Sequence, residues 1–291
     1  MKSGFGKGGA SESRVLQLIT ANASSLSADQ TAALNNVSLG DITDFTGTLH
    51  NYWQLGIPDV QRSGVYAVTT YTPSAAGLTM KVSHSDTAFK GSSASKSVGF
   101  YRMLHQPGFD IAIDIDNIAN VASPYTSDMW HVNLCVCIGG THQTNSMFSA
   151  RLQKKSHNWT CARAISPSDS HFFENGYEDS IDTGLTGFDS SSYPPAVRLR
   201  VQHSIADSGF KAYYSLNSGA SYTTLEGSNG GTGFFQMHTK NSGTMNHTNK
   251  YSVGGPVYVL VTVGQTMNKG TSDNNYQTMQ GECRVTFKDL S

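Results

Sequence analysis

Residues 196–225 are predicted to form three antiparallel strands in a row. In AVRLRVQHS, apolar residues at 197, 199 and 201 alternate with polar residues at 198, 200 and 202, the period of a strand with one buried and one solvated face. Two short strands follow, Lys211 to Leu216 and Ser221 to Leu225. Asn217-Ser218-Gly219 between them suits a type I turn closed by a glycine in the left-handed region. The segment therefore predicts a sheet built from hairpins.

Further strand-like segments occur at short spacing, with polar turns between them. They are residues 65–72, 77–83, 98–106, 109–116, 129–139, 147–154, 159–165, 256–265 and 282–290. Roughly a dozen short strands with few helical segments are typical of a β-sandwich or barrel. Sparse proline, 8 residues, fits many turns between short strands. No fixed-period repeat is visible, which argues against propellers and solenoids.

Alternation within these segments predicts which side chains form the core. The predicted core residues are Phe109, Ile111, Ile113, Ile115, Trp130, Val132, Leu134, Val136, Ile138, Val285 and Phe287. The opposite faces carry Asp110, Asp114 and Asp116 on one strand and His131, Asn133, Cys135 and Cys137 on another. These would form polar sheet surfaces if the sheets are not covered. His203 falls on an apolar face and is interpreted as a core residue, and the segment 256–265, apolar on both faces, is expected to be a central strand.

The N-terminal region differs in composition from the rest. Residues 1–10 are rich in Gly, Lys and Ser and cannot bury enough apolar surface to order themselves. Helical spacing over 13–23, and a capping-box pattern at 27–30 that opens a helix to about Asn36, predict two small helices. They could plug the sandwich or dock it to a larger assembly. We therefore predict an attachment or oligomerisation region at 1–50 and a β-sandwich domain at 51–291.

Charge and cysteine usage exclude several classes of protein. The formal net charge is −1 and only 14% of residues are charged, so bulk charge does not favour nucleic acid or an anionic membrane. No apolar run is long enough for a transmembrane helix, and no secretion signal is recognised. The four cysteines lack the spacing of a zinc site, and we expect free thiols in a reducing cytoplasm. Sequons at Asn22, Asn36, Asn158 and Asn246 are interpreted as chance matches.

The order of these segments resembles the concanavalin A-like lectin/glucanase jelly roll. The resemblance rests on FDIAIDID, MWHVNLCVCIG, AVRLRVQHS, the hairpin FKAYYSLNSGASYTTL, PVYVLVTVGQ and the terminal CRVTFKDL, and it covers about residues 60–291. It implies an all-β jelly-roll sandwich. This architecture is used by lectins, glycosidases, adhesion modules and viral structural proteins alike, so it implies no single activity.

Catalytic and metal sites are weakly indicated. The resemblance implies two glutamates around an aspartate in a glucanase, but the corresponding segment has Ala112, Asp114 and Asn117, so only the central aspartate matches. Asp114 and Asp116 could serve as a carboxylate pair; we favour pairing of these acids with neighbours such as Arg198 and Arg200, and predict no catalytic residues. An acidic loop offers oxygen ligands for calcium, but a solvated loop is the preferred interpretation. Its carboxylates are Glu174, Glu178, Asp179 and Asp182.

Aromatic, amide and hydroxyl groups suggest a glycan-binding surface. The candidate carbohydrate-binding residues are Trp159, Tyr213, Tyr222, Phe235, His238 and Asn246. Three of these lie in the predicted loop 232–251, which could equally contact a protein.

Together these features lead to a functional hypothesis. We expect a non-enzymatic structural protein of a bacteriophage virion, such as a capsid decoration, fibre or tail-associated module, assembled in the host cytoplasm. Residues 1–50 would contact other virion proteins, and the sandwich would stabilise the particle or bind a host surface glycan. A homo-oligomer, for example a trimer, is expected. The alternative is a soluble lectin or glycoside hydrolase of the same fold.

Overall fold

The computed structural model describes most of the sandwich. The described residues are 41–46, 54–55, 68–84, 94–104, 108–122, 129–138, 146–155, 157–166, 182–189, 191–204, 209–226, 238–241, 244–250, 257–267 and 279–291. The predicted helices at 13–23 and 27–36 lie outside them. Within the described part, no helix is long and apolar enough to cross a membrane.

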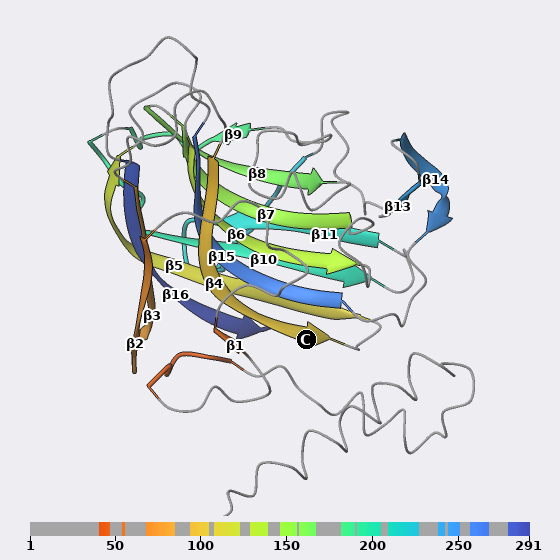
Figure 1. Cartoon of the computed structure of the whole chain (residues 1–291), viewed down its shortest axis with the longest axis horizontal. Coiled ribbons are helices and arrows are strands. Elements are labelled where there is room, and N and C mark those ends of the chain that lie inside the picture. The colour runs from red at the N-terminus through yellow and green to blue at the C-terminus, as the bar shows by residue number, and fades with distance from the viewer. Residues whose placement is uncertain are drawn as a thin grey trace, which may run out of the picture.

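Two seven-stranded antiparallel sheets pack face to face (Figure 1). The front sheet contains, in spatial order, β1 (Gln54–Leu55), β4 (Ala94–Leu104), β15 (Val257–Met267), β6 (Met129–Ile138), β7 (Ser146–Lys155), β8 (Asn158–Ser166) and β9 (Asp182–Gly184). The back sheet contains β12 (Thr223–Thr224), β11 (Gly209–Ser215), β10 (Ala196–Ser204), β5 (Phe109–Ala122), β16 (Met279–Asp289), β3 (Gly77–His84) and β2 (Val68–Ser74). The predicted all-β jelly-roll sandwich of concanavalin A-like type is confirmed.

A separate hairpin lies in the stretch that the sequence assigned to a loop. It consists of β13 (His238–Asn241) and β14 (Thr244–Lys250), which pair antiparallel. The prediction of a loop over 232–251 was therefore wrong for residues 238–241 and 244–250, because these polar strands lack the apolar alternation by which a strand is recognised in a sequence.

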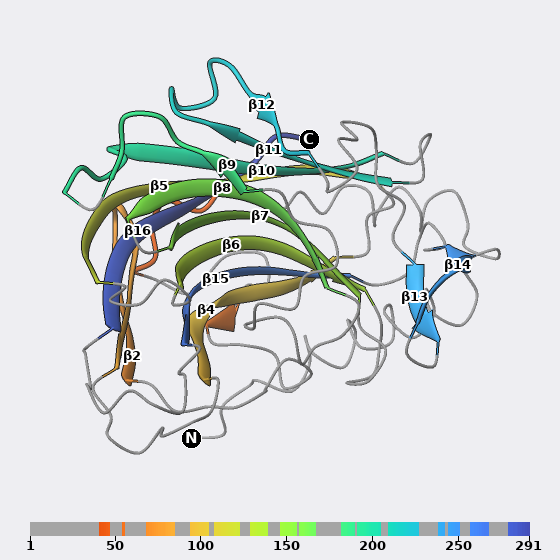
Figure 2. The same ribbon diagram turned by 90° about the horizontal axis from the view of Figure 1, so that it is seen from above.

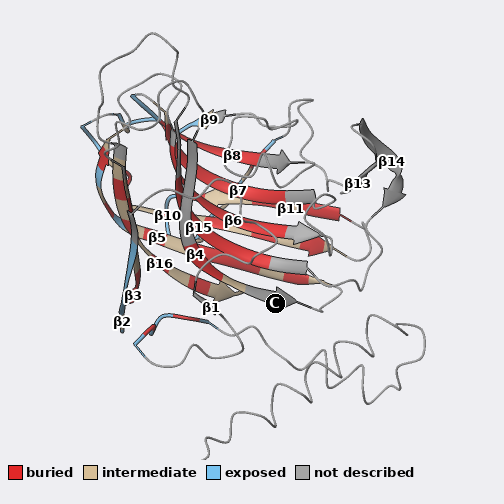
Figure 3. Ribbon diagram, in the orientation of Figure 1, coloured by how far each residue is buried: buried red, intermediate tan, exposed pale blue. Residues whose placement is uncertain are grey.

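The core lies between the sheets and contains the residues that alternation predicted (Figure 3). The predicted core side chains on β5, β6 and β16 are buried, apart from Ile138, whose side chain lies outside the described set. His203 is also a core residue, with its ring between those of Phe109 and Phe210. Figure 2 shows the front sheet arched, with the inside of the arch turned away from the back sheet. Each sheet therefore has one core face and one face directed away from the core.

The sandwich begins before residue 51. The backbone groups of Ile42 and Phe287 form two hydrogen bonds, each 2.9 Å long. The N–H of Phe45 donates to the carbonyl of Ser74 at 3.0 Å. Both side chains are buried in the core, where the Phe45 ring meets Phe100 of the opposite sheet edge to face. Packing of this segment moves the start of the sandwich from residue 51 to residue 41.

Candidate functional site

The outer face of the back sheet carries a row of ion pairs. Arg198 contacts Asp114 through Nε at 2.5 Å and Nη2 at 2.8 Å, and Arg284 contacts Asp116 with both distances at 2.7 Å. Arg200 pairs in the same two-pronged way with Asp110. The expected pairing is confirmed for Asp114 with Arg198, whereas Asp116 pairs with an arginine that was not named in the prediction. The cross-strand register makes it possible, because Arg198 lies directly opposite Asp114.

Two of the predicted glycan-binding residues meet on this face. The Arg200 guanidinium carbon lies 4.9 Å from the ring centre of Tyr213 and 4.8 Å from that of Tyr222. The two rings are edge to face with centres 6.1 Å apart, and the Tyr213 hydroxyl donates to Gln202 Oε1 at 3.1 Å. Both tyrosines are half-buried. We call Arg198, Arg200, Gln202, Tyr213 and Tyr222 the tyrosine patch.

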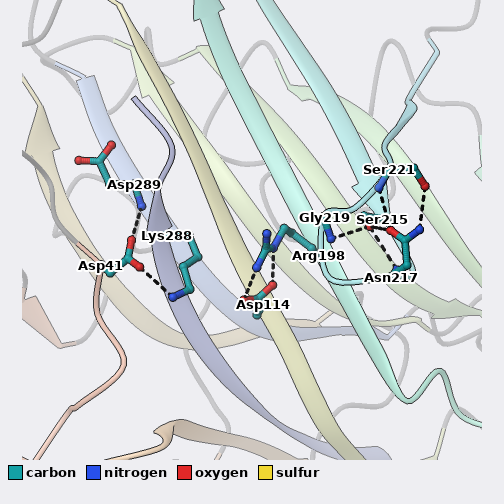
Figure 4. Close-up of polar contacts among 9 residues, drawn as sticks. All are labelled: Asp41, Asp114, Arg198, Ser215, Asn217, Gly219, Ser221, Lys288 and Asp289. Carbon is teal, nitrogen blue, oxygen red and sulfur yellow. Dashed lines mark hydrogen bonds and ion pairs between the residues drawn. The ribbon is translucent and has the colours of Figure 1, made fainter.

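Tyr222 directly follows a hydrogen-bonded turn, in which Ser215, Asn217, Gly219 and Ser221 contact one another (Figure 4). Ser215 Oγ accepts the N–H groups of Asn217 at 3.2 Å and Gly219 at 2.9 Å, and it donates to Asn217 Oδ1 at 2.7 Å. The Asn217 side chain in turn binds Ser221 twice, accepting its N–H at 3.0 Å and donating to its Oγ at 2.8 Å. Gly219 has a φ of 88°, which confirms the predicted left-handed glycine. The turn is therefore pre-ordered, which reduces the entropy lost when a ligand binds.

The two arginines of the patch are each paired with a carboxylate on the same face of the sheet. The hydrogen bonds that Arg198 donates to Asp114 raise the pKa of Arg198 above its ordinary value, and those that Arg200 donates to Asp110 do the same for Arg200. Burial raises the pKa of Tyr213. The arginines therefore stay charged and the tyrosine stays neutral across the physiological range.

Other predicted glycan-binding residues are not part of this surface. Trp159 is only 1% exposed; its ring packs edge to face on Trp130 and Tyr193, and its Nε1–H donates to the carbonyl of Asp189 at 3.0 Å. Its place in the core removes it from a surface site, because Trp159 lies on the core-facing side of β8, opposite to that of Thr160. Phe235 and the side chains of His238 and Asn246 lie outside the described residues.

The same is true of the calcium candidates. Glu174, Glu178 and Asp179 lie outside the described residues, as does the side chain of Asp182 at the start of β9. Among the side chains that the structure describes, no group of three or more His, Cys, Asp or Glu could hold a metal ion. Cys135, Cys161 and Cys283 are buried free thiols, and burial raises the pKa of Cys135 to about 12. Such thiols are unreactive.

A second polar surface lies on the inside of the front-sheet arch. Its side chains, which we call the inner polar face, are His131, Asn133, Ser149, Arg151, Gln153, Thr160 and Thr262. Each is 7% exposed or less. The alternation predicted that His131 and Asn133 point away from the core, which is confirmed, but they are fully shielded from solvent, so they do not form an open sheet surface.

Hydrogen bonds link three strands across this face. Arg151 Nε donates to Asn133 Oδ1 at 2.6 Å, and Asn133 Nδ2 contacts both His131 Nδ1 at 2.9 Å and Thr262 Oγ1 at 3.2 Å. Arg151 fixes the orientation of the amide, because an arginine can only donate. The amide N–H₂ therefore faces the imidazole, so His131 Nδ1 accepts and its proton lies on Nε2. Burial, together with the nearby charge of Arg151, holds the pKa of His131 well below its ordinary value.

Sequence reasoning missed Arg151 and Gln153. Both lie on β7, where they alternate with the buried Phe148 and Leu152 and pair with Asn133 and His131. Strand pairing could have suggested this network. Its burial could not have been predicted from the strands alone.

Comparison with known proteins gives matches to solved structures only. No protein-family model and no curated protein sequence matches the chain. A family 7 alginate lyase in complex with its substrate matches with a TM-score of 0.41 and 10% identity, over 81% of this chain and 92% of that one. A β-1,3-glucanase from Mycobacterium marinum matches with a TM-score of 0.41 and 10% identity, over 84% and 95%.

An endo-β-galactosidase from Clostridium perfringens that releases GlcNAcα1-4Gal also matches, with a TM-score of 0.43 and 8% identity, over 86% of this chain and 61% of that one. Identities and scores at this level carry no information about activity. The fold assignment stands on the two sheets of the chain itself.

Proposed function

We propose that this chain is a non-enzymatic glycan-binding module of a bacteriophage virion, attached through its N-terminal region. The tyrosine patch is the observation that carries the glycan-binding part. It combines two half-buried aromatic rings, an amide and a pre-ordered turn rich in hydroxyl and amide groups. Aromatic faces with a few fixed polar groups are the usual means of sugar recognition.

Carboxylate chemistry favours binding over hydrolysis. Glycoside hydrolysis usually needs two carboxyl groups across the scissile bond, one of them protonated. Asp110, Asp114 and Asp116 are each held by two bonds to an arginine, which occupies the carboxylate oxygens that would have to act on a glycan. The sequences of β4, β6, β7, β8 and β15 contain no Asp or Glu. A lectin-like role is therefore better supported than the hydrolase alternative.

The docked segment 41–46 supports attachment through the residues that precede it. Asp41 binds Lys288 Nζ at 2.8 Å and the N–H of Asp289 at 3.0 Å (Figure 4). Partial burial raises the pKa of Asp41, but these two contacts outweigh it and hold that pKa below its ordinary value. Asp41 is thus held at a fixed point on β16. A partner bound to the preceding residues would therefore be linked directly to the core of the sandwich.

Glycan binding is tested with the full chain on an array of oligosaccharides, followed by calorimetry on any hit. Tyr222→Ala should weaken binding by about tenfold, equivalent to roughly 1.4 kcal/mol, because one of the two rings is lost. Tyr101→Ala is the control, since Tyr101 is a half-buried tyrosine on β4 of the other sheet. Binding that survives Tyr222→Ala, or cleavage of a glycan that is lost in Asp114→Asn, would contradict the proposal.

Attachment is tested by removing residues 1–40, which leaves Ile42 and Phe45 in the core. Light scattering should give a smaller assembly for residues 41–291 than for the full chain, and the shortened chain should no longer join the particle. A cut after residue 50 would not be a fair test, because it removes two core side chains. Equal assembly of both chains would rule out the N-terminal attachment role.

A further inference from the structure

The four sheet edges of the sandwich are not equivalent. Three of them end in strands of two or three residues, namely β1, β9 and β12. The fourth is β2, with seven residues, Val68–Ser74. Its sequence, VTTYTPS, has no charged residue. Natural sheets usually protect edges by shortening or charging them. Within the described residues, β2 is the one edge that is both long and uncharged.

Tyr71 at the middle of β2 is exposed where the register would predict burial. It pairs with Met80, which is fully buried on the core side of β3. Side chains paired across two strands share one face of a sheet, so Tyr71 points to the core side too. Yet Tyr71 is 42% exposed, and Thr70, Thr72 and Pro73 are exposed as well. The sandwich therefore leaves a large aromatic ring uncovered beside its core.

Backbone direction along β2 can be assigned from its turn. Ser74 pairs with Gly77 across a two-residue turn, so its backbone groups are directed to β3 and to Phe45, whose N–H its C=O accepts. Successive residues alternate in direction, which places Pro73, Tyr71 and Thr69 with their backbone groups facing outward. Proline has no N–H, and this is the side on which a strand tolerates it. The outward edge thus offers two N–H donors and three carbonyl acceptors.

We propose that β2 pairs antiparallel with β2 of a second copy of this chain, about a two-fold axis at Tyr71. The axis lies at the central residue, so all seven residues of each strand find a partner. Tyr71 then pairs with the partner's Tyr71. Thr69 pairs with the partner's Pro73, whose carbonyl accepts the N–H of Thr69 and which has no N–H of its own to satisfy. Every outward N–H is satisfied. The two tyrosine rings lie side by side and cover each other, and the two back sheets become one continuous sheet.

An uncharged, self-complementary strand favours a second copy over an unrelated partner. A two-fold pairing about Tyr71 places residues 70 and 72 opposite each other, and likewise 69 and 73, so no charges meet and proline is never required to donate. This contact uses the sandwich itself. It is independent of both the tyrosine patch on the far part of the back sheet and the N-terminal attachment region.

The test uses the full chain in sedimentation equilibrium. Tyr71→Lys places two like charges at the axis and should abolish the β2 contact without altering the thermal unfolding of the monomer. Thr223→Lys is the matched control, because it puts the same charge on the exposed, two-residue edge β12 at the other end of the same sheet. It should leave the assembly unchanged.

A cysteine variant tests the register. Hydrogen-bonded antiparallel pairs have Cα atoms about 5.5 Å apart, within disulfide reach. Tyr71→Cys should therefore give a covalent dimer under mild oxidation, whereas Thr223→Cys and the parent chain should not. A full chain that sediments as a monomer overturns the proposal. So does an assembly that keeps its mass in Tyr71→Lys, or one that forms no cross-link in Tyr71→Cys.

Discussion

The outer face of the back sheet and the inner polar face both present arginines, but the two faces stabilise them differently. Arg198, Arg200 and Arg284 are half-buried and each is bound by two carboxylate oxygens. Arg151 is 2% exposed, and its Nε donates to the amide oxygen of Asn133. Water can replace a lost partner on the first face but not on the second. The inner polar face should therefore be far more sensitive to substitution.

The strongest test of this contrast is Arg151→Ala. The change empties a buried position and leaves the carboxamide oxygen of Asn133 without its donor, at an expected cost of about 3 kcal/mol in the free energy of unfolding. Arg200→Ala, on the outer face, should cost about 1 kcal/mol, because solvent reaches the groups that it leaves behind. Both values come from urea denaturation. Equal costs would show that the inner polar face is not shielded as the structure has it.

Titration of His131 gives the next largest effect. Its pKa in the folded protein is lowered by burial, whereas the unfolded chain titrates near the ordinary value of about 6.5. The unfolded state thus binds the proton first, and stability is unaffected above pH 6.5. Below it, stability should fall by up to about 1.4 kcal/mol per pH unit until the folded pKa is reached. Denaturation midpoints between pH 7 and pH 5 measure this.

His131→Gln is the variant that removes this dependence, since glutamine does not titrate. His157→Gln is its control, because His157 is exposed and should leave the pH profile unchanged. A profile that keeps its slope in His131→Gln would assign the acid sensitivity to other groups.

Local patterning predicted the back sheet better than the front sheet. Alternation alone gave the core positions of β5 and β10 and even the pairing of Asp114 with Arg198, because these strands are adjacent in the sheet and their outer face is half-exposed. His131 and Asn133 follow the same alternation, but whether their face is covered depends on long-range packing that no strand pattern encodes. The core role of Ile42 and Phe45 was missed for the same reason. Two apolar residues in a polar stretch carry no periodicity.

The turn beside the tyrosine patch offers a finer test. Gly219 has a φ of 88°, and a Cβ at this position would touch Arg198 Nη1 and the Tyr222 hydroxyl. Gly219→Ala should cost about 1 to 2 kcal/mol, through backbone strain and the displacement of Arg198 from Asp114. Gly187→Ala is a matched control, since Gly187 has a φ of 91° and nothing within 4 Å of an added Cβ. If Gly187→Ala costs less than Gly219→Ala, the difference is the free energy lost through the contact of the added Cβ with Arg198 and Tyr222. Equal costs would mean that the turn does not hold Arg198.

The smallest expected effect is at the end of the ion-pair row. Arg284 and Asp116 are bound at 2.7 Å, but their side chains are 28% and 36% exposed. Arg284→Ala should therefore cost only about 0.5 kcal/mol, and the cost should shrink further in high salt, because exposed pairs are screened. The cost of Arg151→Ala should not change with salt, since a shielded network is beyond the reach of mobile ions. The free energy of unfolding of both variants is therefore measured at low and at high salt, so that salt concentration alone distinguishes the two faces. Salt-sensitive destabilisation in Arg151→Ala would mean that ions reach the inner polar face, and with them ligands of similar size.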